Sequence, residues 1–488
     1  MDTTPNSAQG KDDSAVSIGR TFSDTTANVH ITPTAKGGTG ADQWLDVNVQ
    51  IGAFPGNLAP TATLTAAPTA VARNSASFSV VALDANADTL AYFWDFGDGT
   101  LSSNASSATH QWAKGGTYTV SVTVSDMKGG TVTRNQSVTV TDPLDTWTTR
   151  TSGTTADLSD IAEGGGSLVA VGYDGPNFKG MYSKSIDGIT WTSGTIKINT
   201  IPAAIIHDGT RFIMVGEEYD FTVPAGWRGA IFTSTDGIAW TRRHFSGVGL
   251  KGVAAGGGVY VAVGKDGRAL RSTDSVAWTP VTSGVTHELK DVTWGGGRFV
   301  AGGGDMANSP YPTAVLTSAD GTTWTNTTSG AGLPSIGDLA EIEYLDGRFI
   351  GGGWNAGIRE STDLGSTFTA TESSFRTMTG IAQGNGTYLA VGAEPGIGGA
   401  DLNLVSTDGK SWTSITTASQ SDRNDLIFFN NTFITVGAGG TIRQSTSVPA
   451  DLAGFAAWVQ LQFPGSPALS GPDEDFDGDG VKNLVEYA

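Results

Sequence analysis

Cysteine is absent from this chain of 488 residues, so its fold cannot depend on disulfide bonds. Long apolar runs are missing too: no stretch of 18 apolar residues occurs, which excludes a transmembrane helix. Basic residues are scarce, with 28 Lys and Arg against 48 Asp and Glu. The resulting formal net charge of −20 repels phosphate backbones and argues against nucleic acid as a partner.

The first residues contain no targeting segment. The opening sequence MDTTPNSAQG has neither a basic n-region nor an apolar h-region, so it is not a signal peptide. The last residues, LVEYA, stop inside a helical pattern. We therefore expect the chain to be a piece of a longer exported bacterial protein, located outside the cell or on its surface.

Glycine is the residue that stands out among those present. The 68 glycines are roughly twice the average usage, and apolar residues rarely recur with the period of a helix. This composition favours an all-β chain with many tight turns. A length of 488 residues predicts two to four domains.

A short phrase recurs through the middle of the chain. It begins at Ser185 and returns every 38 to 49 residues, as SIDGITWT, STDGIAWT, STDSVAWT, SADGTTWT, STDLGSTF and STDGKSWT. Self-similarity of this period is typical of a β-propeller. A very apolar strand accompanies each repeat, and its seven copies lie at Leu168, Phe212, Tyr260, Phe299, Phe349, Tyr388 and Phe433. We therefore expect a seven-bladed propeller over residues 143–449.

The seventh repeat lacks its own Trp-Thr strand. It ends in TIRQSTS at 441–447, whereas the missing sequence, DTWTTR, occurs before the first repeat at 145–150. We expect Trp147 to pair into the seventh blade and close the ring, because a borrowed strand removes an exposed sheet edge.

The repeated phrase resembles the Asp-box, or BNR repeat, of sialidases and other propellers. The resemblance implies that its Ser and Asp side chains accept backbone N–H groups of a sharp turn, with the aromatic residue packed beneath. Only STDLGSTF keeps the usual family spacing, so the other turns are expected to be one residue tighter. The acids of the phrase are expected to be structural: Asp187, Asp236, Asp274, Asp320, Asp363 and Asp408.

Residues 57–142 resemble a PKD domain. The resemblance is carried by YFWDFGDGT at 92–100 and GTYTVSVTVSD at 116–126. It implies an immunoglobulin-like β-sandwich with Trp94 in its core and turns held by Asp95 and Asp98. Three acids of this region are candidates for a weak calcium site: Asp84, Asp88 and Asp98.

Residues 1–56 are expected to be the end of a preceding β domain and a linker. Leu45, Val47, Val49 and Ile51 alternate as in a half-buried strand. The stretch IGRTFSD…VHITP resembles the region behind the catalytic domain of some secreted bacterial metallopeptidases. No HExxH zinc motif is present, so no protease activity is implied.

Residues 450–488 are expected to form an EF-hand-like module with helical segments. DFDGDGVKNLVE, at 475–486, matches the EF-hand loop and resembles the thrombospondin-type-3-like calcium repeats that end many secreted bacterial proteins. The match predicts a Ca²⁺ ion that is held by Asp475, Asp477, Asp479, the carbonyl of Val481, Asn483 and Glu486.

Loops between the second and third strands of each repeat vary greatly, and loops on a rigid scaffold are where binding residues gather. Aromatic residues beside carboxylates suit sugar rings, although such residues are also common in ordinary solvated loops. We expect these loops to recognise a glycan or a surface protein, with the PKD unit as a spacer in a monomeric adhesion protein. The candidate contacts are Tyr173, Glu217, Glu218, Tyr219, Trp227, Arg228, Tyr311 and Glu394.

No complete catalytic constellation is present in the sequence. The chain has no G-x-S-x-G elbow, its five histidines are scattered, and the arginine motif of sialidases near the first blade is absent. The alternative to a binding protein is an accessory region of a secreted carbohydrate-active or peptidase enzyme, or such an enzyme itself.

Overall fold

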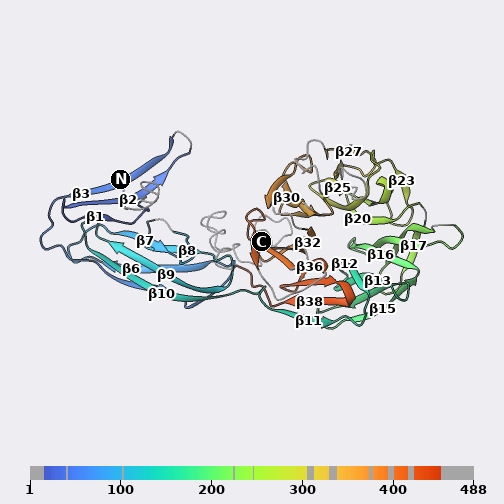
Figure 1. Cartoon of the computed structure of the whole chain (residues 1–488), viewed down its shortest axis with the longest axis horizontal. Coiled ribbons are helices and arrows are strands. Elements are labelled where there is room, and N and C mark those ends of the chain that lie inside the picture. Colours follow the sequence, from blue (N-terminus) through green and yellow to red (C-terminus); the bar gives the residue numbers. More distant parts are fainter. Residues whose placement is uncertain are drawn as a thin grey trace, which may run out of the picture. The chain divides into compact units, whose positions relative to one another are not determined.

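The computed structural model describes residues 16–39, 42–101, 104–223, 226–245, 247–304, 313–328, 338–354, 356–372, 377–393, 401–415 and 423–451. Among these residues the regular structure is β-strand with short 3₁₀ turns and no α-helix, which confirms the predicted all-β class. The chain divides into two compact units, residues 1–142 with 451–487 and residues 143–450 (Figure 1). The expected helical segments after residue 451 lie outside the described residues.

The first unit begins with a three-stranded antiparallel sheet. Its order is β1 (Phe22–Asp24), β2 (Val29–Gly37) and β3 (Trp44–Ile51). One face carries His30 and Thr32, which are buried. The other face of β3 carries apolar residues that are largely exposed, including Ile51 at 74%. The alternation predicted for this strand is therefore present, but its apolar side is not covered by described residues.

Two further sheets of the first unit pack into a sandwich. One has the order β5 (Thr69–Val71), β10 (Thr131–Thr141), β9 (Gly116–Ser125) and β7 (Ala91–Asp95); the other has β4 (Thr61–Ala66), β6 (Ala76–Leu83) and β8 (Ser107–His110). Trp94 is fully buried between them, together with Phe78, Phe96 and Trp112. The indole N–H of Trp94 donates to the carbonyl of Ala105 at 2.8 Å, so burial leaves this donor satisfied.

The described residues of the second unit form seven four-stranded antiparallel sheets. The first consists of β12 (Asp157–Gly164), β13 (Ser167–Asp174), β14 (Lys179–Ser185) and β15 (Thr192–Ile198). The second consists of β16 (Thr200–His207), β17 (Phe212–Tyr219), β18 (Trp227–Ser234) and β19 (Thr241–Phe245). The third consists of β20 (Leu250–Gly256), β21 (Val259–Gly264), β22 (Ala269–Ser272) and β23 (Thr279–Val281).

The remaining four sheets repeat this pattern. They are β24 (Leu289–Gly295), β25 (Arg298–Gly304), β26 (Thr313–Ser318) and β27 (Thr325–Asn326); β28 (Glu341–Leu345), β29 (Arg348–Gly353), β30 (Gly357–Ser361) and β31 (Thr369–Glu372); β32 (Thr377–Gly384), β33 (Thr387–Ala393), β34 (Asp401–Ser406) and β35 (Thr413–Ile415); and β36 (Arg423–Phe429), β37 (Thr432–Gly437), β38 (Thr441–Ser445) and β11 (Trp147–Thr151).

The strand that completes the last sheet comes from the start of the unit. β11 pairs antiparallel with β38, with Trp147 opposite Ser445. The first strand of each sheet contacts the first strand of the next, and β36 of the last sheet contacts β12 of the first. Leu144, just before β11, is fully buried against residues of the sixth and seventh sheets.

The repeated phrase forms the turn between the third and fourth strands of a sheet. In the second sheet, Oδ1 of Asp236 accepts the backbone N–H groups of Ile238 at 2.9 Å and Ala239 at 2.8 Å. The hydroxyl of Ser234 accepts the N–H of Gly237, which has a φ of +71° that favours glycine. In STDLGSTF the corresponding glycine, Gly365, lies four residues after its serine instead of three. The turns differ in length as the spacing predicted.

Candidate functional site

The hairpin between β17 and β18 carries a cluster of aromatic side chains at its tip. The ring of Tyr219 lies edge-on to Phe221, at 4.9 Å between centroids, and to Trp227, at 5.2 Å. Phe221 is 74% exposed, whereas Tyr219 and Trp227 are half-buried. We call Tyr219, Phe221 and Trp227 the aromatic tip. Phe221 was not among the residues expected from the sequence, because a single loop phenylalanine gives no signal without its neighbours.

Polar groups hold the backbone of the aromatic tip. The N–H of Asp220 donates to the carbonyl of Gly226 at 2.6 Å. The carboxylate of Asp220 accepts two bonds from Thr222 and lies 3.6 Å from Nε of Arg228. The bonds from Thr222 and the charge of Arg228 lower the pKa of Asp220. Arg228, a predicted contact residue, therefore sits beside the tip as half of an ion pair.

The predicted contacts Glu217 and Glu218 occupy the strand itself and not a loop. Both are more than nine-tenths buried, because β17 continues to Tyr219. They point to opposite faces of the sheet: Glu217 pairs with Lys265 of the third sheet, and Glu218 pairs with Lys197 of the first sheet at 2.5 Å. Arg242 also donates to Glu218, at 2.9 Å. These ion pairs connect the strand that leads into the hairpin to the two neighbouring sheets.

The other predicted contacts are dispersed or fall outside the description. Tyr173 is half-buried near the end of β13. Tyr311 and Glu394 lie outside the described residues. So does the whole predicted calcium loop, with Asp475, Asp477, Asp479, Val481, Asn483 and Glu486.

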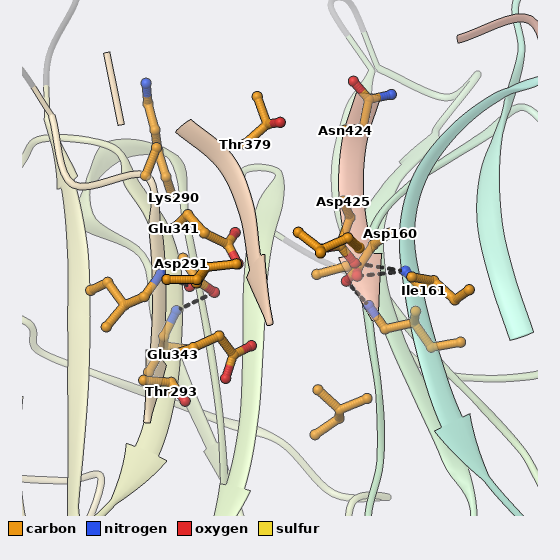
Figure 2. A pocket seen from close by; sticks show the side chains of 18 of the residues that line it. Asp160, Ile161, Lys290, Asp291, Thr293, Glu341, Glu343, Thr379, Asn424 and Asp425 are labelled. Carbon is orange, nitrogen blue, oxygen red and sulfur yellow. Dashed lines mark hydrogen bonds between the residues drawn. The ribbon is translucent and has the colours of Figure 1, made fainter. Parts of the chain in front are cut away.

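A cavity of about 730 Å³ lies where the first strands of the seven sheets meet. We call it the first-strand cavity, because every one of these seven strands contributes lining residues. Acidic side chains project into it from two sides (Figure 2). Asp291, Glu341 and Glu343 come from β24 and β28, and Asp160 and Asp425 come from β12 and β36.

The aspartates of this cavity join neighbouring sheets. Asp291 accepts the N–H of Val292 on its own strand at 2.7 Å and that of Ile342 on the next sheet at 2.8 Å. Asp160 does the same with Ile161 and Ile205, at 2.6 Å each. Each aspartate directly follows a β-bulge in its strand, and a bulge leaves an N–H without a ladder partner.

Burial and mutual repulsion shift the acidity of this group. Burial raises the pKa of Glu343 to about 8 and that of Asp291 to about 7. The pKa values of Glu341, Asp160 and Asp425 are raised in the same direction, chiefly by burial. Although water reaches these half-buried side chains through the cavity, protein surrounds them, and a charged carboxylate is poorly solvated there.

A second acidic group lies in the first unit. Asp84, Asp88 and Asp126 each offer a carboxylate oxygen within 4.8 Å of the others. Within the described residues, Oδ2 of Asp84 and Oδ2 of Asp88 are buried without a hydrogen-bond partner, and Lys128 pairs with the other oxygen of Asp88. Asp98, which the sequence suggested as the third acid, instead lies 2.8 Å from Nε2 of His110.

Comparison with known proteins identifies one of these parts. A family model described as PKD domain matches residues 57–141. Residues 57–141 are a PKD domain. The buried Trp94 and the two-sheet sandwich are those expected from the sequence, so that identification is confirmed.

Solved structures with similarity to the chain include two PKD domains. The PKD1 domain of Vibrio anguillarum Epp is 33% identical over 18% of this chain and 99% of that chain, with a TM-score of 0.16. The PKD1 domain of the Vibrio cholerae metalloprotease PrtV is 29% identical over 17% and 99%, with a TM-score of 0.15.

Several similarities cover a longer part of the chain. The extracellular domain of a hybrid two component system from B. thetaiotaomicron is 10% identical over 60% of this chain and 40% of that chain, with a TM-score of 0.44. In the described part of the chain, no helix has the length and apolar character required to cross a membrane.

Proposed function

We propose that the chain is an extracellular, monomeric binding protein in which a seven-bladed β-propeller of residues 143–449 presents a recognition site and the PKD domain acts as a spacer. The seven four-stranded sheets and the pairing of β11 with β38 support the propeller. The serine and aspartate bonds in the turns support Asp-box hairpins. PKD domains are typical of extracellular bacterial proteins, which supports export.

The aromatic tip is the observation that carries the binding function. The exposed ring of Phe221 and the half-buried rings of Tyr219 and Trp227 offer apolar faces on which the C–H groups of a sugar ring stack. Asp220 and Arg228 beside them offer bonds to hydroxyls. Glu217 and Glu218 are buried in the strand that leads to the tip, and each pairs with a partly exposed lysine of a neighbouring sheet. A preordered tip loses less conformational entropy on binding. The ligand class we propose is therefore a glycan.

Binding of the full chain to an immobilised panel of glycans and matrix proteins tests this function. Phe221→Ala and Trp227→Ala are each expected to weaken binding about tenfold, because an aromatic contact contributes about 1–1.5 kcal/mol. Ile238→Ala is the matched control, since Ile238 is also an exposed apolar residue but lies in a repeated turn. Glycan turnover by the full chain that these variants abolish would favour the enzyme alternative.

We also propose that Ca²⁺ binds this chain, in the loop 475–486 and at the acidic group of the PKD domain. The carboxylate oxygens of Asp84, Asp88 and Asp126 suit a hard cation, and two of them lack hydrogen-bond partners. Calorimetry in calcium and in chelator tests the proposal. Asp84→Asn should reduce the shift in melting temperature of the PKD domain, whereas Asp479→Asn should leave that shift unchanged. An unchanged melting profile with calcium would contradict both sites.

A further inference from the structure

Two acidic side chains of the first-strand cavity meet where the last sheet contacts the first. Asp425 lies on β36 and Asp160 on β12, and both carboxyl groups accept the same backbone N–H, that of Ile161, at 3.1 Å and 2.6 Å. Two carboxylates held this close repel each other, because both are acceptors only. A proton on one of them removes this repulsion and lets it donate to the other.

The hydrogen bonds of these two carboxyl groups join three neighbouring sheets. Oδ2 of Asp425 accepts the N–H of Ile161 at 3.1 Å, which ties β36 to β12 (Figure 2). Asp160 accepts that N–H as well, and its other oxygen accepts the N–H of Ile205 on β16. A continuous chain of bonds thus runs from the seventh sheet through the first to the second.

We propose that Asp160 and Asp425 form a pH-dependent latch: while they share one proton they hold the seventh sheet to the first, and loss of that proton loosens β36, β12 and β11 together. β11 is included because it completes the sheet that contains β36. Two carboxylates in contact repel each other strongly in surroundings that water solvates poorly.

Burial of the two carboxyl groups sets the direction of this response, and other titratable groups line the same cavity. His207 on β16, Lys251 on β20 and Lys290 on β24 line the cavity, and Lys290 pairs with Asp338. Among the acids, Asp291, Glu341, Glu343 and Asp338 line it as well. Burial raises the pKa of Asp160, and burial together with the charge of Asp160 raises that of Asp425. A raised pKa means that the latch is closed at low pH and opens as the pH rises.

Amide hydrogen exchange of the full chain at about pH 5.5 and about pH 8.5 tests the latch. After correction for intrinsic exchange, protection of β36, β12 and β11 should fall about tenfold at the higher pH, which corresponds to a pKa difference of one unit between the closed and open latch. The third sheet, β20 to β23, whose first strand contributes no acid to the cavity, should change much less. An equal loss of protection in all seven sheets, or no loss at all, would overturn a local latch.

Asp425→Asn is the decisive variant. Its amide can accept the N–H of Ile161 and donate to Asp160, so the latch keeps its bonds without a second charge. Protection of the three strands should then become nearly independent of pH. Asp291→Asn is the matched control, because Asp291 makes the same two kinds of backbone bond away from this contact. If Asp425→Asn does not fold, Asp160→Asn replaces it; full pH dependence in either folded variant would refute the proposal.

Discussion

Leu144 provides the most direct quantitative test of how the second unit is built. It lies before the first repeat, yet its side chain is fully buried among Leu389, Val391, Phe433 and Val448 of the last two sheets and their end. The carbonyl of Leu144 also accepts the indole N–H of Trp147 at 2.8 Å, which links it to β11. Leu144→Ala should therefore destabilise sheets that are about 250–300 residues away in sequence.

The expected loss follows from complete burial. A buried leucine replaced by alanine loses transfer free energy and leaves a cavity, which together cost about 2–5 kcal/mol. For a unit of this size, about 3 kcal/mol lowers the melting temperature by roughly 4–6 °C. We expect a shift of that size in the calorimetric transition of residues 143–450, with the transition of the PKD domain unchanged.

Leu45→Ala is the matched control for this substitution. Leu45 is 55% exposed on β3, so the same truncation there should change the free energy of unfolding by less than about 0.5 kcal/mol. A loss below about 1 kcal/mol in Leu144→Ala would show that this segment does not pack into the last sheets in solution. The pairing of β11 with β38 would then lose its support.

Three further substitutions test other parts of the account. Glu343→Gln should flatten the pH dependence of the free energy of unfolding, measured by urea titration. Because the pKa of Glu343 is raised to about 8, its carboxyl contributes fully to stability below about pH 4.5 and loses that contribution as the pH rises through about 8. We expect this loss to be roughly 2–4 kcal/mol after allowance for the water in the cavity. Asp236→Ala removes the acceptor of two turn N–H groups and should cost about 1 kcal/mol, seen as faster amide exchange in that turn. Trp94→Ala should cost the PKD domain about 3–5 kcal/mol by calorimetry, with no shift in the second unit.

Local patterns in the sequence were sufficient to predict most of the fold. The all-β class and the turns at each repeated phrase follow from short-range spacing, because Ser234, Asp236 and Gly237 act on one another within four residues. The pairing of Trp147 with the last sheet was predicted by counting, since one repeat lacked a strand that occurred elsewhere. The PKD domain was recognised from a motif that contains its own core residue, Trp94.

Features that depend on long-range packing could not be predicted in the same way. The sequence placed Glu217 and Glu218 in an exposed loop, but in the structure they are buried on β17. Their cationic partners, Lys265 and Lys197, come from two other sheets. Three acids of the first-strand cavity, Asp160, Asp291 and Asp425, lie at equivalent bulged positions. Other repeats have Ala204, Gly252 and Gly380 at that position, so the pattern is incomplete.

The group of acids in the PKD domain shows the same limit. Asp126 joins Asp84 and Asp88 through the return of β9 to the end of the sandwich where β6 stops, whereas the nearer Asp98 pairs with His110. The sequence therefore predicted the wrong third acid for this group, Asp98 instead of Asp126. Only the pairing of strands brings Asp126 beside the other two.

Binding of the full chain to the glycan panel, compared between wild type and Trp227→Ala, is the decisive measurement for the aromatic tip. We expect saturable binding to at least one glycan that weakens about tenfold in Trp227→Ala and is unchanged in Ile238→Ala. No binding to any glycan, or binding that Trp227→Ala and Phe221→Ala leave intact, would contradict a recognition role for the aromatic tip.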